Sequence, residues 1–180
     1  MTIFEDLRKD YQIARETSLE YQRSSALFAQ RLARRFQIYI GAPDNYRTMK
    51  QDDTRWYVQP MRTTLRGHND FVSETPEGLH DLLTKDEDGY WLVGLRLTLD
   101  IAANAFPKDN FVFLLKFTIR GGECEMSVGF GKDARKFQAD DDEGIKPIFD
   151  NMISQLKELF ARKPWDMPKK NTIGFTAQSE

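Results

Sequence analysis

The chain has 180 residues, a net charge of −2 and a charged content of 30%. This length suits one domain with a single sizeable core, and the apolar content of 40% excludes a globally disordered chain. No apolar run approaches the roughly 20 residues that a membrane-spanning helix needs. The start, MTIFEDLRKD, lacks the basic and then apolar stretches of a signal peptide. We therefore expect a soluble, cytoplasmic protein.

The first predicted element is one long helix over residues 2 to about 35, because no glycine or proline occurs before Gly41. Thr2 and Glu5 have the spacing of a capping box at its start. Apolar and small residues repeat along it in alternating steps of three and four: Phe4, Leu7, Tyr11, Ala14, Ser18, Tyr21, Ser25, Phe28 and Leu32. Two serines interrupt this repeat, so the helix either packs along its own domain or self-associates as a weak coiled coil.

Short strands are expected next. Residues 36–40, FQIYI, alternate and are rich in strand-forming residues, which predicts a strand that ends at Gly41. Residues 55–65 form a second candidate, where Pro60 indicates an edge position or a bulge. Residues 67–88 have the composition of a loop with a short helix over 75–83.

The strongest strand signals lie in the middle of the chain. Residues 90–101 show strong alternation, and residues 111–120 and 123–130 alternate on either side of Gly121-Gly122. A two-residue turn at these glycines predicts a hairpin with five apolar or oppositely charged pairs: Arg120 with Glu123, Ile119 with Cys124, Phe117 with Met126, Leu115 with Val128, and Phe113 with Phe130. Residues 135–138 are a last strand candidate.

A second amphipathic helix is expected to close the domain. Its apolar residues follow helical spacing, namely Ile145, Ile148, Phe149, Met152, Ile153, Leu156, Leu159 and Phe160. The acidic run 140–143 stands where carboxylates cap a helix start. The expected architecture is one α+β domain over residues 1–163, with both helices on one side of an antiparallel meander of five or six strands. Residues 164–180 are expected to form an extended tail.

One group of residues has the chemistry of a metal site. His68, Asp70, His80 and Asp81 lie in one predicted loop, and imidazole and carboxylate groups both bind divalent ions. Their spacing fits no known zinc motif and no helical i, i+4 pair. They suggest a metal-dependent hydrolase or nuclease, while solvated loop residues are the simpler interpretation. We predict no organic cofactor, because the chain lacks a glycine-rich phosphate loop.

Positive charge is concentrated in one segment. Residues 23–66 carry nine basic and three acidic side chains, interleaved with aromatic residues. Such a segment favours an anionic partner, either nucleic acid or an acidic protein, unless the arginines pair with acids of the same chain. Alternation places Arg55 and Tyr57 on one face of the strand at 55–65. The candidate partner-binding residues are Arg47, Arg55, Tyr57, Arg62 and Arg66.

These patterns favour a non-enzymatic interaction module over an enzyme. The contact surface would be the first helix, which would also support self-association, or the basic segment. The lone cysteine, Cys124, has the inward phase of a core residue rather than a reactive thiol. The two alternatives are the metal-dependent enzyme centred on residues 68–81 and a nucleic-acid-binding protein.

Overall fold

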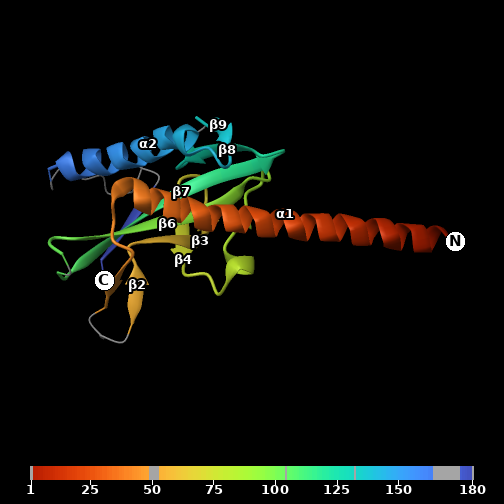
Figure 1. Ribbon diagram of the computed structural model, residues 1–180, viewed down its shortest axis with the longest axis horizontal. Helices are drawn as coiled ribbons and strands as arrows, with labels where there is room; N and C mark the ends of the chain where they lie inside the picture. The colour runs from red at the N-terminus through yellow and green to blue at the C-terminus, as the bar shows by residue number, and fades with distance from the viewer. Residues whose placement is uncertain (1, 49–52, 104, 132, 164–174, 180) are drawn as a thin grey trace.

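The computed structural model describes residues 2–48, 53–103, 105–131, 133–163 and 175–179. It confirms an α+β fold (Figure 1), in which helices α1 (Ile3–Ile40) and α2 (Asp142–Ala161) pack on one face of an antiparallel sheet. About half of α1 extends beyond the sheet as a free rod that ends at the N-terminus.

The sheet is larger than predicted. It has eight strands: β3 (Val58–Leu65), β4 (Phe71–Glu74), β5 (Thr84–Lys85), β6 (Trp91–Asp100), β7 (Lys108–Arg120), β8 (Glu123–Val128), β9 (Arg135–Gln138) and β10 (Phe175–Ser179). The main path runs β4-β3-β6-β7-β8-β9, while β5 pairs with β6 and β10 pairs with β7. Five of its strands match predicted ones, namely β3, β6, β7, β8 and β9. The three others were not predicted: β4 and β5 lie in the expected loop at 67–88, and β10 belongs to the predicted tail. Residues 164–174 of that tail lie outside the described part of the chain.

The central hairpin has the predicted register over four of its five pairs. Phe117 faces Met126 and Arg120 faces Glu123, and the turn glycines Gly121 and Gly122 have φ values of 58° and 86°. The fifth pair is wrong, because β8 ends at Val128 and Phe113 pairs with a residue of β10 instead.

The predicted strand at residues 36–40 is also wrong, since α1 continues through Ile40. Phe36 is fully buried in the helix, with its ring 5.1 Å from Phe149 and 6.3 Å from Phe113. Tertiary packing therefore overrides the local preference for a strand. The helix ends at Gly41, which has a left-handed φ of 67°.

The region from 45 to 85 differs in detail from the prediction. The candidate strand at 55–65 is divided into β2 (Thr54–Trp56), which pairs with β1 (Asn45–Arg47) in a separate hairpin, and β3. Pro60 lies in the half of β3 that pairs with β6 alone, since β4 pairs only with residues 62–65. It therefore has the open edge that proline needs. The expected helix at 75–83 is reduced to one 3-10 turn, η1 (Leu79–Asp81).

Both helices contribute to one core. The second half of α1 buries Phe28, Leu32 and Phe36, and α2 buries Ile145, Phe149 and others against the same sheet face. The acidic run has the predicted role at the start of α2, because the Asp141 carboxylate accepts the N–H of Glu143.

Candidate interaction surface

The four residues of the predicted metal site lie on two separate elements. His68 and Asp70 are in the exposed turn between β3 and β4, whereas His80 and Asp81 belong to η1. Asp81 pairs with Arg62, with an Nε–Oδ1 distance of 3.1 Å. Among the described residues, which include all four, no three His, Cys, Asp or Glu side chains converge on a position for a metal ion. The fold does not gather these residues into a site.

The arginines of the basic segment are distributed over α1, the β1–β2 hairpin and β3. Within the described residues, several pair with nearby acids: Arg34 with Asp44, Arg35 with Asp142, Arg55 with Asp53, and Arg62 with Glu74 and Asp81. Arg47 and Arg66 are exposed, and Lys50 lies outside the described residues. Much of the positive charge is therefore compensated within the fold, as expected if the arginines pair with acids of the same chain.

Tyr57 does not share an exposed face with Arg55. It is buried, with 7% of its surface exposed, and its hydroxyl donates to Oδ2 of Asp100 over 2.7 Å. The cause is the break between β2 and β3, because alternation along one continuous strand does not hold across Tyr57.

Tyr57 belongs to a buried ion-pair cluster that sequence reasoning missed. Lys108 is fully buried and donates from Nζ to Oδ2 of Asp100 over 2.8 Å. The rings of Tyr46, Phe106 and Tyr57 surround its ammonium group, with centroids 4.7, 5.0 and 5.4 Å away. Such contacts stabilise a buried cation. The sequence signal was the pair of opposite charges at facing ends of two consecutive strands, Asp100 in β6 and Lys108 in β7.

The electrostatics of this cluster favour an ion pair. Burial alone lowers the pKa of Lys108, but the hydrogen bond that Lys108 donates to Asp100 and the nearby negative charge raise this pKa overall above its ordinary value. Burial raises the pKa of Tyr57, and its hydrogen bond to Asp100 adds to that effect. A mostly apolar cavity of about 830 Å³ adjoins Asp100. Because Lys108 neutralises this carboxylate, the cluster's clear role is to join the ends of β6 and β7.

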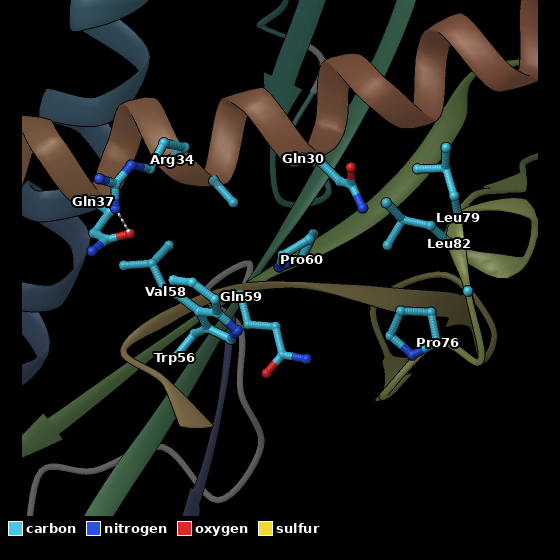
Figure 2. A pocket seen from close by; sticks show the side chains of 12 residues that line it. Gln30, Arg34, Gln37, Trp56, Val58, Gln59, Pro60, Pro76, Leu79 and Leu82 are labelled. Carbon is cyan, nitrogen blue, oxygen red and sulfur yellow. Dashed lines mark hydrogen bonds between the residues drawn. The ribbon is translucent and has the colours of Figure 1, made fainter. Parts of the chain in front are cut away.

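A second cavity lies between α1 and β3 (Figure 2), with a volume of about 460 Å³. Three of its polar side chains, Arg34, Gln37 and Gln59, already form hydrogen bonds within the fold. Arg34 donates to Gln37 over 3.1 Å, and Gln59 accepts from Arg96 over 2.6 Å. Much of the remaining lining is apolar: Ala33, Trp56, Val58, Pro60, Pro76, Leu79 and Leu82. This groove has little polar chemistry left with which to select a ligand.

Cys124 is buried, as its phase predicted. It is fully enclosed in the core, and burial raises the pKa of its thiol to about 12. A thiol in this state is a poor nucleophile at neutral pH.

The first half of α1 exposes apolar side chains for which the described fold provides no covering surface. We call residues 2–20 the projecting segment, and every one of them is exposed. The segment is roughly 27 Å long at 1.5 Å per residue, and most of it projects away from the other described elements (Figure 1). Near its end, Leu19 lines a hollow together with Leu79 and His80 of η1. Phe4, Leu7 and Tyr11 have 65%, 61% and 68% of their surface exposed. With Ala14 and Ser18 they form one stripe, which we call the seam.

The seam has the same orientation on the helix as the face that packs on the sheet. In a helix of 3.6 residues per turn, positions 18 residues apart are separated by about five full turns and point the same way. The seam residues at 7, 11, 14 and 18 therefore align with those at 25, 29, 32 and 36. These four partners are all buried: Ser25, Ala29, Leu32 and Phe36. One continuous face of α1 is thus covered by the sheet in its second half and uncovered in its first.

Local interactions hold the projecting segment as a helix. Thr2 and Glu5 form the predicted capping box, with both hydrogen bonds present. At the other end, Tyr21 fixes the helix to the sheet: its hydroxyl is 3.1 Å from that of Thr118, and its ring is 5.7 Å from Trp91. Because the rest of α1 is anchored, the segment extends an existing helix and avoids the cost of nucleation.

Comparisons of the chain with protein-family models, with curated proteins and with solved structures found no match. In the part of the chain that the structure describes, no helix has the length and apolar character required to cross a membrane.

Proposed function

We propose that this chain is a non-enzymatic, cytoplasmic interaction module that docks the seam of its projecting segment against a helix of a protein partner. The observation that carries the proposal is the alignment of the exposed seam with the buried face of the same helix. A helix at a domain surface normally has its apolar stripe covered, and recognition through residues at i, i+3, i+4 and i+7 is a common mode of helix binding.

The composition of the seam supports a protein contact. Phe4 and Tyr11 supply large apolar surfaces, and aromatic residues are enriched among those that dominate binding energy at protein interfaces. Charged residues flank the stripe, with Arg8 and Arg15 on one side and Asp10 on the other. An apolar centre with a charged margin is the usual arrangement of a helix-packing surface.

The test is a pair of matched variants in the full-length chain. Leu7→Glu with Tyr11→Glu adds two negative charges on the seam. Gln12→Glu with Ile13→Glu adds the same charge on the far side of the helix, where Ile13 is 54% exposed. Glutamate has a good helix propensity, so helix content by circular dichroism should stay unchanged in both.

Native size should then be compared in extracts of the cells that express the protein. We expect the parent and the far-side variant to elute in an assembly, and the seam variant to elute as a 21.0 kDa monomer. Identical elution of all three proteins would overturn the proposal that the seam binds a partner.

A further inference from the structure

We propose that the partner on the seam is a second copy of this chain, with the two projecting segments packed antiparallel about a two-fold axis. This inference rests on the proposed function and names its partner. Homo-oligomers with one two-fold axis are the commonest assemblies, and their interfaces use the same surface on both copies.

We call the sheet, α2 and the part of α1 from Tyr21 onward the body of the molecule. The position of the body relative to the seam decides whether two copies pack parallel or antiparallel. From Tyr21 onward, the sheet of the same chain occupies the face of α1 that continues the seam. A parallel pair would place both bodies between two helices whose axes are only about 8–10 Å apart. The helices would have to diverge, so that they touch only near their tips. In one copy the body lies at one end of the projecting segment (Figure 1). In an antiparallel pair the two bodies would therefore lie at opposite ends, and the whole seam would be available.

The sequence of the seam selects a register. In antiparallel coiled packing, Phe4 lies opposite Ala14 of the second copy and Leu7 lies opposite Tyr11. Each pairing occurs twice, which gives four layers with apolar residues on both sides and a large residue facing a small one at each end. The helix of the second copy, which begins at Ile3, then ends opposite Arg15, more than one turn before the body begins at Tyr21. A shift of one heptad would place Leu7 against Ser18 and lose this match.

The area is sufficient for a weak dimer. Phe4 and Tyr11 expose about two thirds of their surface, and a fully covered aromatic side chain buries about 150–250 Å². With Leu7, Ala14 and the flanking stems, each copy buries on the order of 500 Å², or about 1,000 Å² in total. This is at the low end for specific interfaces, so we expect reversible association with a dissociation constant of about 1–100 μM.

The flanking charges provide an independent test of orientation. In the antiparallel pair, Arg8 lies near Arg8 of the second copy, and Asp10 lies near Asp10 of the second copy. These exposed like-charge pairs weaken association only slightly, and salt screens them, so the dimer should tighten as salt rises. A parallel pair would instead bring Asp10 next to Arg15 and would loosen with salt.

The decisive experiment combines sedimentation equilibrium with site-specific cross-linking of the full-length chain. Because Cys124 is buried, a cysteine introduced on the projecting segment is the one accessible thiol among the described residues. Positions 3 and 17 lie on the same flank of the helix. In the antiparallel register, position 3 of one copy lies beside position 17 of the other, whereas the two copies of position 3 are far apart, as are the two copies of position 17. The variants are therefore Ile3→Cys and Thr17→Cys. A short bismaleimide should therefore link a mixture of the two variants, and neither variant alone.

The outcomes separate this inference from the proposed function. Support requires a concentration-dependent dimer of the purified parent, its loss in Leu7→Glu with Tyr11→Glu, and cross-linking in the mixture only. A purified parent that stays monomeric to about 1 mM overturns the second-copy inference. If the seam variant still alters native size in extracts, the seam binds a different protein. Cross-linking within single variants, or a dimer that loosens with salt, overturns the antiparallel arrangement.

Discussion

Lys108 is the residue whose burial most needs its partners. Its Nζ donates to Asp100 over 2.8 Å, and the side chain has no exposed surface. The pKa of Lys108 is raised in the folded state above an ordinary value of 10.5. The stabilisation that depends on its charge is therefore fully present below about pH 10.5 and is lost as the pH rises through the folded-state pKa.

We predict that Lys108→Met lowers the free energy of unfolding by about 3–5 kcal/mol, because it leaves the Asp100 carboxylate without its counter-charge. The measurement is urea denaturation at pH 7. Lys108→Met combined with Asp100→Asn should cost less than the sum of the two single changes, since the double variant leaves no unpaired charge. Strict additivity would show that the pair is not coupled.

The central hairpin shows what alternation predicts well at the scale of one element. Phe117 was expected on the inner face opposite Met126, and the structure has this register. Its side chain is fully buried, and its ring is 5.3 Å from that of Phe28 in α1. A buried sheet face specifies register strongly, because a slip of one residue would turn every apolar side chain outward.

Phe117→Ala should lower the free energy of unfolding by about 3–5 kcal/mol, through lost burial and the cavity left beneath α1. Phe4→Ala is the matched control, since it removes the same atoms from an exposed position. Measured by denaturation in dilute solution, it should cost less than about 1 kcal/mol. Similar losses for both variants would contradict the assigned packing.

Where prediction of an element failed, a distant contact or a break was responsible. Residues 36–40 have strand composition, yet they complete α1 because Phe36 packs between the sheet and Phe149. Tyr57 was assigned to the wrong face because the strand breaks at that residue. Both outcomes depend on residues far away in the chain, which a local pattern does not contain.

For the whole molecule, the seam was predictable but its exposure was not. The repeat of three and four residues from Phe4 to Leu32 runs through α1 without a change in character. Only the fold shows that the sheet covers this face from Tyr21 onward and leaves the first half free. The candidate metal residues illustrate the converse, because closeness in one predicted loop did not bring them together in space.

The last prediction concerns a chain that lacks residues 1–18, and it tests whether the body folds independently of the projecting segment. Each of residues 2–18 is exposed, so their removal takes away no core contact. The free energy of unfolding of the truncated chain should therefore be within about 1 kcal/mol of that of the parent in dilute solution. Association stabilises the folded state by mass action. The thermal midpoint of the parent should therefore rise with protein concentration, while that of the truncated chain should stay constant. Leu7→Glu with Tyr11→Glu should behave like the truncation although it keeps the helix. A truncated chain that unfolds at a much lower denaturant concentration would show that the segment supports the body, and a concentration-dependent midpoint after truncation would place the self-association surface elsewhere.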